Sequence, residues 1–227
     1  MSGLNRDEVV RLASLATGDE KHEVSSYSTL DVLMVLYGRV LRFDSDRPDW
    51  EERDRFILSK GHGPSAFYAV LAARGFFPEE WLSTFMAREG RLGGHPDRRL
   101  IPGVEASTGS LGHGLGLSVG IGLALRAKGL EKQRVFCLTG DAELNEGSNW
   151  EAILVAPQLR LSNLTLVVID NHSSSIPMGP WEDKFMSFGW HARAVDSRDH
   201  EQLYGALSYR DAEWPAVVIA DVQPVGG

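Results

Sequence analysis

Two polar turns, each directly after an apolar run, contain the residues of this sequence most suited to chemistry. Gly140-Asp141-Ala142 follows an apolar run that begins at Val135, and Asn171 follows the apolar run 164–169. A Gly-Asp turn ahead of a helix offers backbone amides to a phosphate and a carboxylate to a cation. Asn171 adds a neutral oxygen, and Mg²⁺ prefers such hard oxygen ligands beside phosphates. The two turns therefore indicate a site for a phosphorylated ligand and a divalent cation.

The spacing of Asp141 and Asn171 carries more information than either residue alone. Taken singly, Asp141 is more simply explained as a helix cap and Asn171 as a turn residue. The two residues lie 30 positions apart, which is enough for a helix and a returning strand. Parallel strands of such a unit end at the same edge of the sheet, where ligands bind. We therefore expect the two side chains to lie close together.

Strand-like and helix-like patterns alternate along the whole chain, which predicts one α/β domain over residues 1–227 with a doubly wound parallel sheet. The continuous apolar run 164–170 is typical of a strand covered on both faces. The predicted strands are 55–58, 134–139, 164–170 and 216–221. The predicted helices are 6–16, 29–41, 65–74, 78–87, 111–127, 146–158 and 201–208. Helix 111–127 is rich in Gly and Ala and is predicted to be tightly packed and buried.

Composition and charge exclude several classes of protein. The net charge of -8 and the lack of a Lys/Arg stripe argue against nucleic-acid binding. The single cysteine, Cys137, excludes a disulfide framework and is predicted to be a small buried strand residue. Residues 1–11 are charged and contain no signal-peptide core, and the run 164–169 is too short to cross a membrane. We therefore expect a cytoplasmic protein that binds neither nucleic acid nor membranes.

Several motifs resemble those of a known enzyme family. Gly140-Asp141 followed 30 residues later by Asn171 resembles the cofactor signature of thiamine diphosphate enzymes. Further motifs resemble transketolases in particular and occur in the family's order. They are Leu58-Ser59-Lys60-Gly61-His62, Gly94-His95-Pro96, residues 107–114 (STGSLGHG), residues 139–147 (TGDAELNEG) and Trp150-Glu151-Ala152. The likeness extends from about residue 6 to residue 221, as in the N-terminal subunit of split, two-chain transketolases.

The resemblance implies that the chain binds thiamine diphosphate through Mg²⁺, or through Ca²⁺ or Mn²⁺ in its place. Asp141, Asn171 and the backbone carbonyl of Ser173 would hold the metal. The residues implied to contact the cofactor are His62, Gly109, Leu111, Gly140, Asp141, Ala142, Glu143 and Asn171. Among them, the amides of Ala142 and Glu143 and the His62 side chain would contact the diphosphate. Gly109 and Leu111 would pack around the rings.

Three histidines, His22, His62 and His95, are implied to line the substrate channel and to act in catalysis. His22 matches the family only through its spacing to Asp31. The implied reaction moves a two-carbon ketol unit from a ketose phosphate, such as xylulose 5-phosphate, to an aldehyde. Proton transfers at sugar hydroxyls suit groups that titrate near neutral pH.

The sequence departs from the family at four places. Ala142 stands where a third glycine is usual, and because alanine adopts positive φ only at a cost, that turn is expected to use ordinary dihedral angles or to shift slightly. Residues 21–24 (KHEV) replace a Gly-His-Pro-Gly-like segment, and His113 stands where glutamine is more usual. Relatives also continue beyond Gly227 with a Gly/Lys segment and a later histidine loop.

The resemblance also implies a pyrimidine-binding domain whose glutamate activates the cofactor, and no segment of the 227 residues matches it. We therefore expect a second subunit that carries the pyrimidine-binding and C-terminal domains, in an α2β2 assembly. Two alternatives stay open. The acceptor could be the thiol of a lipoyl group or an acyl carrier protein, as in 2-oxo acid dehydrogenase-like enzymes. The chain could also be a degenerate scaffold, although the intact Asp141, Asn171, His62 and His95 argue against that.

Overall fold

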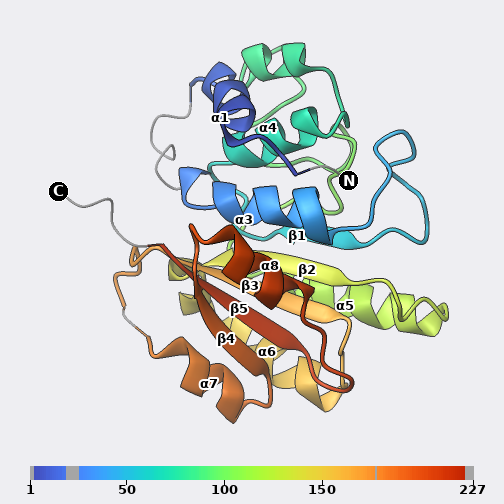
Figure 1. Ribbon diagram of the computed structural model, residues 1–227, viewed down its shortest axis with the longest axis vertical. Helices are drawn as coiled ribbons and strands as arrows, with labels where there is room; N and C mark the ends of the chain where they lie inside the picture. The colour runs from blue at the N-terminus through green and yellow to red at the C-terminus, as the bar shows by residue number, and fades with distance from the viewer. Residues whose placement is uncertain (1–2, 19–25, 177, 223–227) are drawn as a thin grey trace.

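Five parallel strands form one sheet in the computed structural model, which describes residues 3–18, 26–176 and 178–222 (Figure 1). The strands are β1 (Arg55–Leu58), β2 (Val135–Gly140), β3 (Leu164–Asp170), β4 (His191–Asp196) and β5 (Ala216–Asp221). Their spatial order is β1-β2-β3-β5-β4, so the chain moves outward from β1 to β4 and then returns to insert β5. Because all pairs are parallel, the carboxyl ends of the strands lie at one edge of the sheet.

Helices cover both faces of this sheet (Figure 1). On the first face lie α3 (Leu30–Val35) with its continuing π-helical turn Leu36–Val40, α4 (Ser65–Ala73) and α8 (His200–Ser208), and α1 (Arg6–Leu15) packs against α4 in an outer layer. The second packs against α5 (Gly114–Ala127), α6 (Gly147–Gln158) and α7 (Trp181–Ser187). The 3-10 helices Glu79–Thr84 and Ala142–Asn145 complete the elements of the described residues.

The period of two along each strand explains this division. Phe136 and Leu138 of β2 lie in the first apolar cluster, while Val135 and Cys137 lie in the second. All four are fully buried, as are most residues of β3, which accounts for the continuous apolar runs in the sequence. Cys137 is a buried strand residue as predicted, and burial raises the pKa of its thiol far above the ordinary value.

The doubly wound α/β fold class is confirmed, and each predicted strand is present with its ends shifted by at most one residue. The sequence analysis missed β4 and α7. Most β4 side chains are exposed, since it is an edge strand in which Val195 alone is buried, so it has no apolar run. The predicted helix 78–87 is a shorter 3-10 helix, Glu79–Thr84. No helix within the described residues is long and apolar enough to cross a membrane.

The prediction that residues 111–127 form a buried helix was wrong in two respects. Helix α5 begins at Gly114, because Gly112 has a positive φ of 86° that a helix does not accept. One face of α5 is also exposed, including Gly116, Leu117, Gly120 and Ala124. The Gly and Ala residues of α5 therefore occur on both of its faces: the face that packs against the sheet and the face that no described residue covers.

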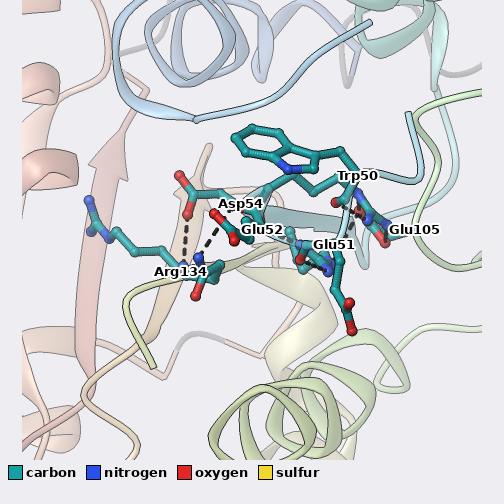
Figure 2. Close-up of polar contacts among 9 residues, drawn as sticks. Trp50, Glu51, Glu52, Asp54, Glu105 and Arg134 are labelled. Carbon is teal, nitrogen blue, oxygen red and sulfur yellow. Dashed lines mark hydrogen bonds and ion pairs between the residues drawn. The ribbon is translucent and has the colours of Figure 1, made fainter. Parts of the chain in front are cut away.

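A polar network at the amino end of the sheet holds β1 and β2 together (Figure 2). The Asp54 carboxylate accepts hydrogen bonds from the backbone N–H of Arg42 and of Arg134, both at 2.8 Å. Nearby, the Arg53 guanidinium donates to both oxygens of Glu105, at 2.8 and 2.9 Å. These contacts fix the loop before β1 at the edge opposite the polar turns.

Replacing Asp54 with Ala should lower the free energy of unfolding by about 2 kcal/mol, because two backbone N–H groups lose a charged acceptor. Urea unfolding of the chain measures the change. Asp49 is an exposed aspartate of the same loop, and Asp49→Ala should stay within about 0.5 kcal/mol of the parent. Equal midpoints for Asp54→Ala and the parent would contradict this role of Asp54.

Candidate active site

The turns after β2 and β3 meet at the carboxyl edge of the sheet. Gly140 pairs with Ile169, and the Asp141 N–H donates to the Ile169 carbonyl at 2.9 Å. The Asp141 carboxylate accepts from the Ser173 hydroxyl at 2.9 Å and from the Ser174 N–H at 3.0 Å. The strands therefore bring Asp141 beside the turn that contains Asn171 and Ser173, as the 30-residue spacing predicts.

The oxygen atoms of this region fit a hard cation. Asp141 is only 2% exposed. The Asn171 side-chain oxygen is buried and has no hydrogen-bond partner among the described residues, so it is free to accept from a water molecule or to bind an ion. Each Asp141 oxygen has a second lone pair beyond the serine contacts. Carboxylate, amide and carbonyl oxygens form the set that Mg²⁺ or Ca²⁺ prefers.

Protein side chains alone would not complete such a coordination shell. Across residues 3–18, 26–176 and 178–222, no group of three or more His, Cys, Asp and Glu residues is arranged to hold a metal ion. A cation at Asp141 therefore needs neutral oxygens, which Asn171 and the Ser173 carbonyl can offer. It also needs oxygens from its ligand, and phosphate supplies these.

The turn after β2 accommodates alanine without backbone strain. Asp141 has helical dihedral angles, φ -57° and ψ -46°, and Ala142 begins the 3-10 helix Ala142–Asn145. The non-glycine residues with positive φ in the described chain are Met86, Arg160 and His172, so Ala142 is not among them. The expectation of ordinary dihedral angles is confirmed. The first amides of this helix have no partner within the helix itself, as at any helix N-terminus.

The His62 and His95 segments converge on Gly109. A Cβ atom on Gly61 would lie 2.7 Å from both the Gly109 nitrogen and the Thr108 hydroxyl oxygen. The turn after β1 therefore packs closely against the loop that contains Thr108 and Gly109. Gly109 has a φ of 141°, and a Cβ there would lie 2.5 Å from Cδ2 of the His95 ring. The fold thus places His95 directly against the Gly109 backbone, which the turn that leads to His62 also contacts.

The remaining candidate residues are placed as follows. Leu111 is half-buried two residues beyond Gly109, and His62 is half-buried, whereas His95 is exposed. His113 is exposed at the start of α5, with its Nδ1 3.2 Å from the Leu111 carbonyl. His22 lies outside the described residues.

The sequence analysis named Lys60 within a motif and Glu143 for its backbone amide, but missed that both side chains are buried charges beside this turn. Lys60 is 4% exposed and Glu143 is 1% exposed. Burial lowers the pKa of Lys60 to about 8, while the charges of Glu143 and Asp141 act in the opposite direction. Burial also raises the pKa of Glu143, opposed by hydrogen bonds from Ser59 and Gly112. A lysine two residues after the short strand-like run 55–58 was the signal available in the sequence.

A cavity of about 540 Å³ adjoins Asp141 on the side of β3 and β5. Its lining includes Asp170, His172, Trp181 and Asp221. The Trp181 indole N–H donates to Asp170 at 2.9 Å, and His172 Nε2 lies 3.0 Å from Asp221. This volume is within the range of small-molecule sites, so the carboxyl edge is hollow next to the candidate metal ligands.

Comparison with known proteins assigns the chain to a family. Residues 8–223 match the family described as "Transketolase, thiamine diphosphate binding domain". An apulose-4-phosphate transketolase subunit from Actinobacillus succinogenes is 37% identical over 214 residues, which are 91% of this chain and 77% of that protein. The chain therefore belongs to the transketolase family, as a thiamine diphosphate binding domain.

A relative from Rhodococcoides fascians bears a different name. It is called Ferredoxin fas2 and is 46% identical over 217 residues, which are 95% of this chain and 71% of that protein. Ferredoxin clusters are held by four cysteine thiolates. This chain has one cysteine, so the name does not describe the chemistry of the residues matched here.

Solved transketolases share the fold. The Pichia stipitis enzyme in complex with sedoheptulose-7-phosphate superposes with a TM-score of 0.83 at 25% identity, over 94% of this chain and 35% of that chain. The Leishmania mexicana enzyme gives a TM-score of 0.77 at 25% identity, over 93% and 36%. The present chain thus spans about a third of the length of these transketolases.

Replacing Gly109 with Ala should displace the His95 ring, because the new Cβ would lie 2.5 Å from it and the φ of 141° strains any side chain. We expect a loss of about 1–3 kcal/mol in the free energy of unfolding and shifted imidazole NMR signals of His95. The matched control is Gly205→Ala in α8, where no described atom lies within 4 Å of the added carbon. Unshifted His95 signals in a fully stable Gly109→Ala protein would contradict the contact.

Proposed function

We propose that this chain is the diphosphate- and metal-binding subunit of a two-chain, transketolase-like transferase. We also propose that residues 1–227 form a single thiamine diphosphate binding domain. The observation that supports the first proposal most directly is the buried, unpartnered oxygen of Asn171, in the turn whose Ser173 and Ser174 donate hydrogen bonds to the Asp141 carboxylate. A buried polar atom without a partner is costly. A divalent cation bridging to a diphosphate would satisfy it.

In this proposal the ligands of the cation are Asp141, Asn171 and the backbone carbonyl of Ser173. The turn at Gly140 directs the amides of Ala142 and Glu143 toward the diphosphate, and the His62 side chain contacts it from the turn after β1. Gly109 and Leu111 pack around the rings. When bound, thiamine diphosphate supplies the electron sink for carbon–carbon bond cleavage, and the protein supplies position and electrostatic field.

The histidines are proposed to hold and move protons at the hydroxyls of the sugar. The segments of His62 and His95 converge on Gly109, which supports a shared channel. His22 is proposed as a third member. Imidazoles suit this task because their ordinary pKa lies near neutral pH.

The proposed donor is a ketose phosphate and the proposed acceptor an aldehyde. The names of similar proteins support a sugar substrate: an apulose-4-phosphate transketolase and a 6-deoxy-6-sulfo-D-fructose transketolase from Clostridium sp.. Neither name includes a lipoyl group or a carrier protein, so we place the carrier-thiol acceptor second. Trapping the reaction with ketose and chasing it with either aldehyde or carrier protein separates the two.

A second polypeptide is proposed to cover the cofactor and to supply the pyrimidine-binding domain, in an α2β2 assembly. The names of similar proteins support it, since they are named as single subunits of transketolases. The exposed apolar side chains of Leu117 on α5 and of Leu154 and Val155 on α6 are a suitable contact surface. The small residues Gly116 and Gly120 beside Leu117 would allow close approach.

Asp141→Ala should weaken Mg²⁺-dependent binding of thiamine diphosphate by about 100-fold or more, because the diphosphate loses its bridging cation. Calorimetry with the partner chain present measures the affinity. Asp196→Ala is the matched control, since Asp196 is an exposed aspartate at the end of β4 on the same edge. Unchanged affinity in Asp141→Ala would remove the metal-site assignment.

The isolated chain should show no transferase activity and should gain it on mixing with a partner of roughly 300 residues, the size of the two domains to be supplied. Water would otherwise reach the ring system from the open side. The measurement is donor-dependent turnover of the chain alone, followed by titration of the partner. Full turnover by the homogeneous, isolated chain would overturn the two-chain proposal.

A further inference from the structure

One buried carboxylate joins three segments that the proposed cofactor site needs. The Glu143 carboxylate accepts a hydrogen bond from the Ser59 hydroxyl at 2.5 Å and from the Gly112 N–H at 2.9 Å through the same oxygen. The Ser59 oxygen in turn accepts from the Gly114 N–H at 3.0 Å. The turn after β2, the turn after β1 and the start of α5 are therefore connected through Glu143.

The packing around this carboxylate leaves the segments little freedom. A Cβ atom on Gly114 would clash with the Ser59 side chain, and one on Gly112 would lie 2.5 Å from the Ser148 oxygen. Ser148 also donates to the Gly112 carbonyl at 2.8 Å. The Gly112–Gly114 backbone is thus held between the turn after β1 and the start of α6.

Lys60 provides the positive charge next to Glu143. Its stem lies along Gly140, where an added Cβ would approach Lys60 Cδ to 3.0 Å, and its charge interacts with both Glu143 and Asp141. Both Lys60 and Glu143 are almost completely buried. The second Glu143 carboxylate oxygen has no hydrogen-bond partner among the described residues, so the two charges act on each other through space. Removing one of two neighbouring buried charges leaves the other uncompensated, whereas removing both together costs much less.

We propose that the Glu143 side chain is a positioning residue of the diphosphate site, through its hydrogen bonds with Ser59 and Gly112. This rests on the proposed function. The backbone amides of the turn after β2 face the proposed diphosphate. Glu143 fixes the position of this turn relative to two other segments, which are the turn of His62 and the segment 109–111 that leads into α5. Donors must be held within a few tenths of an ångström of their places to bind well. The loss of Glu143 therefore weakens cofactor binding without removing a side chain that contacts the cofactor.

The test compares Glu143→Ala, Glu143→Gln and the control Asp54→Ala in the full chain with its partner. Asp54 is matched because its carboxylate also accepts two hydrogen bonds, at the opposite edge of the sheet. The readouts are the calorimetric Kd of thiamine diphosphate at saturating Mg²⁺, and kcat at saturating cofactor. Urea unfolding confirms that each variant is folded.

We expect Glu143→Ala to raise the cofactor Kd about 10-fold or more while kcat at saturation stays within about 3-fold, since binding and not chemistry is affected. Glu143→Gln retains an oxygen acceptor for Ser59 and Gly112, and should return the Kd to within about 3-fold of the parent. Asp54→Ala should lose stability and keep the parent Kd. A Kd for folded Glu143→Ala within about 2-fold of the parent overturns the proposal.

Two further variants keep the proposal testable if Glu143→Ala does not fold. Ser59→Ala removes the bridge to Gly114 with a smaller change in volume, and should raise the Kd about 5-fold; an unchanged Kd overturns the positioning role. Lys60→Met should lower the urea midpoint, and Lys60→Met with Glu143→Gln should recover part of that loss. A double variant less stable than Lys60→Met overturns the pairing.

The failure of this proposal differs from that of the proposed function. A parent chain that binds no thiamine diphosphate in the presence of its partner and Mg²⁺ would overturn both. Tight binding that is equal in the parent, Glu143→Ala and Ser59→Ala would overturn only the positioning role and would leave the cofactor assignment in place.

Discussion

The parallel register of β1, β2 and β3 is the constraint on which the candidate site depends. Leu58 pairs with Leu138 and Gly140 pairs with Ile169, so the turns after the three strands begin close together at one edge. Fully buried strands of this kind are fixed by packing on both faces, and a shift of one residue would move every side chain to the other face. The positions of Asp141 and of the turn at Asn171 are therefore a consequence of the core.

The same burial makes charge at this edge expensive. Asp141, Glu143 and Lys60 are all nearly inaccessible, and in such surroundings a carboxylate or an ammonium group needs compensation. Lys60 and Glu143 compensate each other across the turns after β1 and β2, and Ser59 and Gly112 donate to Glu143. Asp141 receives hydrogen bonds from Ser173 and Ser174. The Asp141 carboxylate is thereby held at the edge where, in the proposal, a cation would bind it together with a diphosphate.

The two-chain proposal depends on an exposed apolar surface as well as on the candidate site. The candidate residues lie along an open edge of the sheet, and apolar side chains of α5 and α6, namely Leu117, Leu154 and Val155, are exposed on the second face of the fold. Such a surface suits a two-chain assembly, which the names of similar transketolase subunits also support. In the two-chain proposal the diphosphate is held here, while water is excluded by the partner.

Local sequence was sufficient for four of the five strands and for the prediction that the turns of Asp141 and Asn171 meet at one edge of the sheet, because both depend on short-range patterns. The apolar runs ending at Gly140 and Asp170 defined β2 and β3, and the residues after them defined the turns. Strand β4 and helix α7 were missed, since an exposed edge strand lacks an apolar run and is formed only by pairing with β5. The exposure of one face of α5 was missed because the sequence pattern of a Gly/Ala-rich helix is the same whether that face is covered or not.

The buried Glu143 carboxylate shows most clearly what tertiary structure alone decided. In the sequence it is one acidic residue of a 3-10 turn, and nothing local separates it from the exposed Glu146 three residues on. Its partners Ser59 and Gly112 are 84 and 31 positions away, and they reach it only after β1 and β2 have paired and α5 has docked. The amino-acid pattern determined which residue types stand at the strand ends. Long-range packing determined which of their side chains face inward, because burial depends on neighbours far away in the chain.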